Sequence, residues 1–157
     1  MTQEERALLV SMQAWCGRQE RCTQDVHMKL VRMGLSSAIQ EKVIAKLKEE
    51  RFLDDERFAI AYAEGKSRLK KWGPMKVRAG LSVKRLPPEL IELALSHLEE
   101  SAMQETMIGL LKQHWPRIKG KTQFERKSKS VKFLMGKGYA YGTAMKAFET
   151  WSQESDE

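Results

Sequence analysis

Hydrophobic residues recur along the chain at the three- and four-residue spacing of amphipathic helices, and no segment alternates apolar and polar residues over the length of a strand. Ile39, Val43 and Leu47 are typical, since every fourth residue lies on nearly the same helix face. We predict helices near residues 4–17, 24–33, 37–50, 55–70, 75–82, 88–100, 103–115, 124–136 and 140–152. The pattern therefore predicts an all-α protein.

The same pattern of apolar positions occurs three times. A shift of 51 residues relates the first copy to the second, and a shift of 53 relates the second to the third. The matched positions are Val26, Leu30, Leu35, Ile39, Val43, Ile44 and Leu47, then Val77, Leu81, Leu86, Leu90, Ala94, Leu95 and Leu98, then Leu134, Tyr139, Thr143, Ala147, Phe148 and Trp151. We predict three tandem three-helix repeats, at 1–51, 52–101 and 102–157, in an elongated, curved array that is either right- or left-handed.

Several residues mark the ends of the predicted helices. Asp54 precedes the fourth helix in the position of a side-chain cap, and Asp55 would favour the positive end of that helix dipole. Pro74 stands at the first position of the fifth helix. Gly34 and Gly138 occupy equivalent places in the tight turn between the second and third helices of their repeats. These signals agree with the repeat layout.

Charge adds a strong basic bias. The 157 residues carry a net charge of +7, with a pI near 9.5. Residues 66–85 contain eight basic residues and no acidic one, and residues 112–137 contain nine basic residues against one acid, Glu125. Two such runs favour nucleic acid or an acidic protein groove as partner over a merely solvated helix face. The longest apolar run, 58–63, has six residues, so we expect no membrane span.

Candidate catalytic and metal-binding residues are few. Cys16 and Cys22 are the only cysteines, and their spacing is not that of a usual metal-binding pair. The three histidines have no second ligand one helical turn away. The segment 120–122 (Gly-Lys-Thr) matches only the end of a phosphate-binding loop, because Trp115 occupies the position of the loop's first glycine. We therefore predict a non-enzymatic protein without cofactor or metal. We expect no secretory signal, and a reducing, cytoplasmic location.

The candidate contact surface consists of cations in and beside the two basic runs. The predicted contact residues are Arg57, Lys66, Arg68, Lys70, Lys71, Lys76, Arg78, Lys119, Lys121, Arg126, Lys127, Lys129 and Lys132. Long cations near aromatic rings suit phosphate and single-strand contact. For Trp72 and Trp115, which lie among these cations, we favour a role as core or helix-end residues over direct contact.

The middle repeat resembles the RecX family of RecA regulators. The resemblance rests on 52–58 (Phe-Leu-Asp-Asp-Glu-Arg-Phe), on 66–68 (Lys-Ser-Arg), and on 72–78 (Trp-Gly-Pro-Met-Lys-Val-Arg) followed by Leu81. Two positions depart from the family pattern. Gly80 stands where a charged helix former is usual, and Arg85 occupies a turn where glycine is usual. The outer repeats match by layout more than by motif.

The resemblance implies a modular helical protein that lies in the groove of the RecA–DNA filament. Such a protein would inhibit ATP hydrolysis and strand exchange by RecA, in DNA repair, recombination and the SOS response. Its partners would be the RecA filament and single-stranded DNA or the phosphates of the filament's DNA. We expect a monomer that catalyses no reaction itself.

Two other classes of protein fit the residues. The paired helices of each repeat could act as helix-turn-helix readers of duplex DNA, in which case the protein would bind a defined duplex without RecA. The helical array could also be a protein-docking solenoid for which charge is incidental. If the protein binds an apolar partner and the affinity does not depend on salt, the solenoid is favoured.

The repeat predicts an elongated particle in solution, because stacked repeats contact mainly their neighbours. Small-angle X-ray scattering should give a radius of gyration above that of a compact sphere of the same mass. A spherical particle with a single core would contradict the tandem arrangement.

Overall fold

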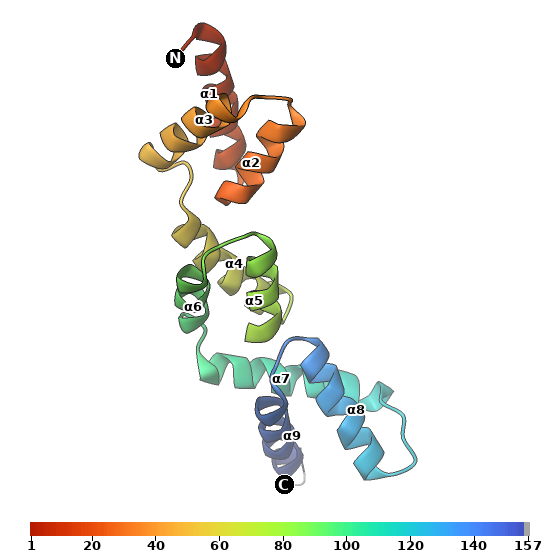
Figure 1. Cartoon of the computed structure of the whole chain (residues 1–157). Helices are drawn as coiled ribbons and strands as arrows, with labels where there is room; N and C mark the ends of the chain where they lie inside the picture. Colours follow the sequence, from red (N-terminus) through yellow and green to blue (C-terminus); the bar gives the residue numbers. More distant parts are fainter. Residues whose placement is uncertain (156–157) are drawn as a thin grey trace. The chain divides into compact units, whose positions relative to one another are not determined.

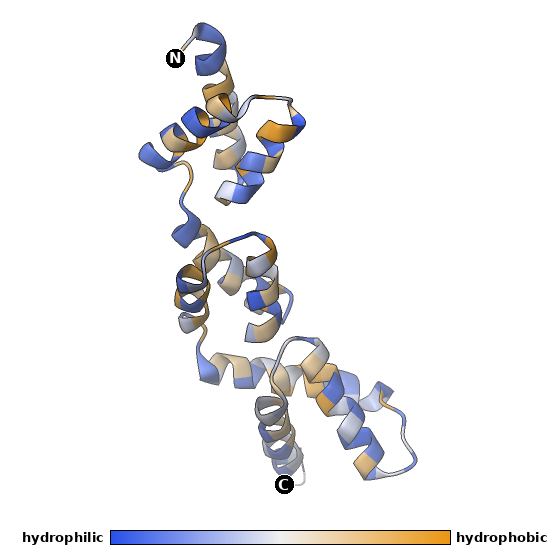
Figure 2. Cartoon of the chain, in the orientation of Figure 1, coloured by the Kyte–Doolittle hydropathy of each residue, from blue (hydrophilic) through white to orange (hydrophobic). Residues whose placement is uncertain are grey.

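A computed structural model describes residues 1–155 of the chain, and Figure 1 shows their helices. These residues form nine α-helices and one short 3-10 turn, with no strand, so the all-α prediction is confirmed for this part of the chain. The elements are α1 (Gln3–Arg18), α2 (Thr23–Arg32), α3 (Ser37–Glu49), α4 (Asp55–Leu69), α5 (Pro74–Val83), α6 (Pro88–Ser96), α7 (Glu100–His114), η1 (Trp115–Arg117), α8 (Gln123–Gly136) and α9 (Tyr141–Ser155). Each helix carries both hydrophobic and hydrophilic residues, as amphipathic helices require (Figure 2).

The helix bounds agree with the predicted ranges to within one residue except around α6 and α7 and at the end of α9, which extends to Ser155 instead of 152. Helix α6 ends at Ser96, four residues before its predicted end, and α7 begins at Glu100. Glu99 separates them with an extended backbone at ψ 133°. Helix α7 ends at His114 because Pro116 has no amide hydrogen to continue the hydrogen-bond pattern, and the chain passes into η1.

The described chain divides into two compact units. Unit 1 comprises Met1–Ala61 and Leu81–Ala94, and unit 2 comprises Tyr62–Gly80 and the chain from Leu95 onward. The predicted middle repeat thus contributes segments to both units. One apolar core belongs to unit 1 and consists of Leu9, Met12, Cys16, Val26, Leu30, Val43, Leu47 and Leu53. Another belongs to unit 2 and consists of Met107, Leu110, Leu111, Val131, Leu134, Tyr139, Ala144, Ala147, Phe148 and Trp151.

Three turns at the predicted repeat spacing share one backbone conformation. Gly34, Arg85 and Gly138 stand at the 51- and 53-residue spacing, and all three have left-handed φ angles of 76°, 59° and 105°. At each turn the following residue donates its amide hydrogen five residues back, as in Leu35 N–H to the Leu30 carbonyl. This is the Schellman pattern that ends a helix in a left-handed residue. The carbonyls that accept these bonds belong to Leu30, Leu81 and Leu134, whose side chains are fully buried.

Gly80 has a structural reason that the sequence did not reveal. A β-carbon at this position of α5 would collide with the hydroxyl oxygen of Tyr62 on α4. Glycine costs about 1 kcal/mol relative to alanine inside a helix. Glycine is nevertheless favoured at position 80, because any larger residue would displace the ring of Tyr62.

Arg85 provides a test of backbone strain. A left-handed conformation costs a residue with a β-carbon about 1–2 kcal/mol, and glycine avoids this cost. We expect Arg85→Gly to raise the free energy of unfolding by about 1 kcal/mol in urea denaturation. Gly34→Ala is the matched control, because the added β-carbon meets no atom within 4 Å and only the φ angle of 76° opposes it. It should lower the free energy by a similar amount. A loss of stability in Arg85→Gly would contradict this account.

Candidate nucleic-acid interface

Asp54 and Asp55, at the start of α4, accept hydrogen bonds from the first turns of two helices, α4 and α2. Asp54 accepts a hydrogen bond from the Arg57 backbone amide at 3.0 Å, as its predicted role as a cap requires. The Asp55 carboxylate instead accepts from both the backbone amide and the hydroxyl of Thr23, at 2.7 and 2.8 Å. Thr23 is the first residue of α2, so its amide hydrogen has no acceptor within that helix. Asp55 supplies this acceptor from the first turn of α4.

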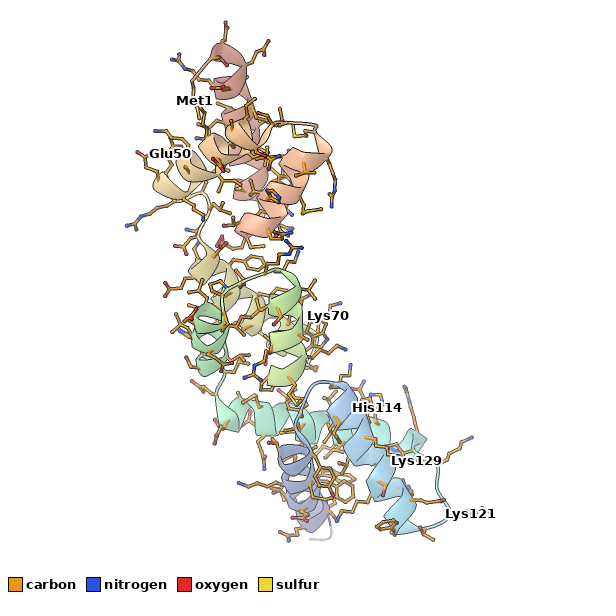
Figure 3. The ribbon with its side chains drawn as sticks, in the orientation of Figure 1. Met1, Glu50, Lys70, His114, Lys121 and Lys129 are labelled. Atoms are coloured by element: carbon orange, nitrogen blue, oxygen red, sulfur yellow. The ribbon has the colours of Figure 1, made fainter. Side chains whose placement is uncertain are left out.

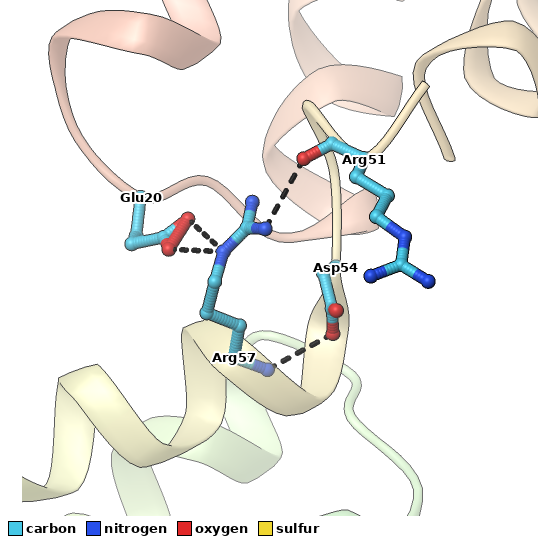
Figure 4. A network of polar contacts seen from close by, with 4 residues as sticks. All are labelled: Glu20, Arg51, Asp54 and Arg57. Atoms are coloured by element: carbon cyan, nitrogen blue, oxygen red, sulfur yellow. Dashed lines mark hydrogen bonds and ion pairs between the residues drawn. The ribbon is translucent and has the colours of Figure 1, made fainter. Parts of the chain in front are cut away.

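Arg57 lies in a polar network within unit 1. Its Nε donates to both carboxylate oxygens of Glu20, at 3.0 and 2.5 Å, and its Nη1 donates to the Arg51 carbonyl at 3.1 Å (Figure 4). The hydrogen bond to Glu20 raises the pKa of Arg57. The structure thus places this predicted contact residue in an intramolecular ion pair.

A second ion pair in unit 1 joins the end of α5 to the start of α2. Lys84 Nζ donates to Asp25 at 2.7 Å. The same carboxylate accepts from the Cys22 backbone amide at 3.2 Å. Burial opposes ionisation of Asp25, but the hydrogen bonds from Lys84 and Cys22 outweigh it and lower the pKa.

Unit 2 contains a corresponding contact made by the main chain. The turn after α8 meets the start of α5, where Gly73 N–H donates to the Lys137 carbonyl at 2.7 Å and Met75 N–H to the Gly138 carbonyl at 2.9 Å. A β-carbon on Gly73 would approach the Gly138 carbonyl carbon to 2.5 Å, so the contact requires glycine. Tyr139 is buried beside it and donates its hydroxyl to the Lys71 carbonyl at 3.3 Å. Burial raises the pKa of Tyr139 to about 12.

The structure separates the cations of the first basic run into two groups. Lys66 and Lys76 place their ammonium groups 5.0 and 4.9 Å from the centre of the Trp72 ring, where they make cation–π contacts. Trp72 is half-buried beneath them. Arg68, Lys70 and Lys71 are exposed and form no ion pair within residues 1–155. Arg78 is also exposed but makes a further intramolecular interaction.

The second basic run is divided in the same way. Arg126 stacks 3.6 Å from the centre of the Trp115 ring and donates to the carbonyls of Ile118 and Trp115. Lys129 donates to the Lys119 carbonyl, and Lys127 lies 4.0 Å from Glu149. Among the predicted contact residues of this run, the exposed lysines without an ion pair within the described residues are Lys119, Lys121, Lys129 and Lys132. Lys121 and Lys129 lie on the loop before α8 and on α8 itself (Figure 3).

An aromatic groove lies beside this second run, and sequence reasoning missed it. It has a volume of about 820 Å³ and lies between the start of α8 and the end of α9. Trp115, Phe148 and Trp151 line it, with ring centres 5.2–5.8 Å apart, and Phe124 and Lys127 line it from α8. The available signal was Phe124 itself, an aromatic residue within a polar, basic segment.

Residues 1–155 contain no group of three histidine, cysteine or carboxylate side chains placed to hold a metal ion. In the same residues, no helix combines the length and apolarity needed to cross a membrane.

Comparison with known proteins identifies the kind of protein that this fold represents. A family model described as RecX, second three-helix domain, matches residues 54–95. Regulatory protein RecX of Prosthecochloris aestuarii is 31% identical over 125 residues, which cover 80% of each chain. Regulatory protein RecX of Thermus thermophilus is 29% identical over 116 residues, covering 74% of this chain and 72% of that one. The crystal structure of RecX from Lactobacillus salivarius shares the fold, with a TM-score of 0.86 at 18% identity over 97% of this chain and 99% of that one.

The described chain is therefore an all-helical protein with exposed cations on its surface. The chain belongs to the RecX family.

The two aspartates of the motif should differ in their contribution to stability. Asp54→Ala removes a local cap and should lower the free energy of unfolding by about 1 kcal/mol. Asp55→Ala leaves two partly buried donors of Thr23 without a partner and should cost about 1–3 kcal/mol. Urea denaturation measures both.

A double-mutant cycle tests the Asp55 contact directly. Thr23→Ala should destabilise the wild-type protein but add little in the Asp55→Ala background, because the partner of the hydroxyl is already gone. Simple addition of the two effects would contradict the contact between Asp55 and Thr23.

Proposed function

We propose that this chain is a cytoplasmic regulator that binds the RecA–DNA filament and restrains ATP hydrolysis and strand exchange by RecA. One observation carries the proposal beyond family membership. Two sets of exposed cations, one in each basic run, form no intramolecular ion pair within residues 1–155, and both belong to unit 2. Their charge is available to an anionic partner, and the filament offers both DNA phosphates and protein carboxylates.

The mechanism requires no chemical step by this chain. Exposed lysine and arginine side chains that neutralise phosphates release condensed counterions, and this gain supplies affinity that falls with salt. A helical protein held on the filament in this way would oppose the rearrangements that accompany ATP turnover. Arg57 contributes less in this proposal, because Glu20 already neutralises it.

The proposal predicts that reversal of Arg68, Lys70 and Lys71 to glutamate greatly weakens inhibition. The measurement is the ATPase activity of RecA on single-stranded DNA while the protein is titrated in. We expect the half-inhibitory concentration to rise by at least about tenfold at moderate salt. We also expect the salt dependence to fall by about one unit of slope for each phosphate that the variant no longer neutralises. Helicity should be unchanged, since exposed charges contribute little to folding.

Reversal of Lys42, Lys46 and Lys48 on α3 is the matched control. It changes the net charge by the same amount, but Lys42 lies 3.7 Å from Glu5, and Lys46 lies 3.7 Å from both Glu49 and Glu50. It should affect inhibition much less. Greater damage by the α3 variant, or inhibition that ignores salt, would exclude the proposed surface. Tight binding to a duplex in the absence of RecA would favour a helix-turn-helix DNA reader instead.

A further inference from the structure

Phe124 is exposed in a way that the packing of unit 2 does not explain. Its side chain is 77% exposed, and it takes no part in the buried core around Trp115, Phe148 and Trp151. Burying a phenylalanine would contribute about 1.5–3 kcal/mol, which this fold forgoes. A large apolar side chain on the rim of a groove is a feature of binding surfaces.

The local structure holds Phe124 in place. Thr122 caps α8 by accepting a hydrogen bond from the Glu125 amide at 3.1 Å, and the Glu125 carboxylate accepts from the Lys121 amide at 2.6 Å. Phe124 lies in this capped first turn. The backbone that carries the ring is therefore ordered, and little backbone entropy would be lost if a ligand stacked on the ring.

Exposed positive charge lies beside the groove, in the loop before α8. Lys121 precedes Phe124 and is exposed, and Lys127 lines the groove one helical turn after it. Glu149 is the acidic residue in the lining, and Lys127 lies 4.0 Å from it. The volume of about 820 Å³ falls within the range of roughly 300–1,000 Å³ found for ligand clefts.

We propose that Phe124 is a stacking platform for a base of single-stranded nucleic acid. The aromatic groove receives the base, and Lys121 contacts a flanking phosphate. Exposed aromatic rings beside cations are the combination with which proteins bind single strands without reading their sequence. The inference deepens the proposed function, since the filament's DNA would supply the strand, but its test needs no RecA.

Two polyanions separate stacking from charge. One is a fluorescent oligothymidylate of about 20 nucleotides, longer than the roughly 4–16 nucleotides of a single-strand site. The other is an abasic oligomer of equal length, which keeps the phosphates and lacks the bases. Fluorescence anisotropy gives both affinities at low salt. Quenching of tryptophan emission supplies a second signal, because Trp115 and Trp151 line the groove.

We expect Phe124→Leu to weaken oligothymidylate binding by about 5- to 100-fold, the range that base–aromatic stacking gives, and to leave abasic binding unchanged. Phe124→Tyr keeps a flat ring and should retain both affinities. Val83→Ala is the matched control, because Val83 is also 77% exposed and carries no ring. It should change neither affinity.

Three results would overturn the inference: oligothymidylate binding that survives Phe124→Leu, equal loss with both polyanions, or no preference of the wild-type protein for the oligomer with bases. The first, combined with lost RecA inhibition, would instead assign the groove to a protein partner. If Phe124→Leu loses the preference for bases while RecA inhibition by the wild type is absent, the stacking inference stands and the filament proposal fails.

Discussion

The first amide hydrogens of an α-helix have no acceptor within that helix, and the groups that supply one join helices far apart in the sequence. In unit 1 the start of α2 is completed by the Asp55 carboxylate, which belongs to the following repeat. In unit 2 the amides of Gly73 and Met75 at the start of α5 are completed by the carbonyls of Lys137 and Gly138. The same need is met once by a side chain and once by the main chain. A three-helix segment of about 50 residues, the length of one predicted repeat, buries little apolar surface by itself, so contacts of this kind add to its stability.

The sequence predicted what depends on neighbours within one helix or turn. Most helix bounds, the cap by Asp54 and the tight turns at Gly34 and Gly138 follow from local spacing, and the structure agrees with them. The sequence alone could not predict contacts between residues that are far apart along the chain. Asp55 bonds to a residue 32 positions earlier and Arg57 to one 37 positions earlier, so both were assigned only local or surface roles.

The candidate surface shows the same division between local and distant information. Counting cations along the chain identifies basic runs, but it does not reveal which of these cations already contact other groups of the same chain. Arg126 stabilises the loop before α8 through Trp115 and two carbonyls, while Lys119 and Lys121 in that loop form no ion pair among the described residues. Phe124 was missed because one exposed aromatic residue has no periodic pattern. Its position beside the groove arises only when α8 and α9 pack together.

Both cysteines of the chain lie in unit 1 and none in unit 2. Cys16 and Cys22 are buried and unpaired, and burial raises the pKa of both thiols, that of Cys22 to about 11. Thiolate is the form that reacts with alkylating reagents, so neither residue is reactive while the unit is closed. The native protein therefore carries its own reporter of local opening. The alkylation rate follows how often unit 1 exposes its interior, and any partner that holds α1 and α2 in place would slow that rate.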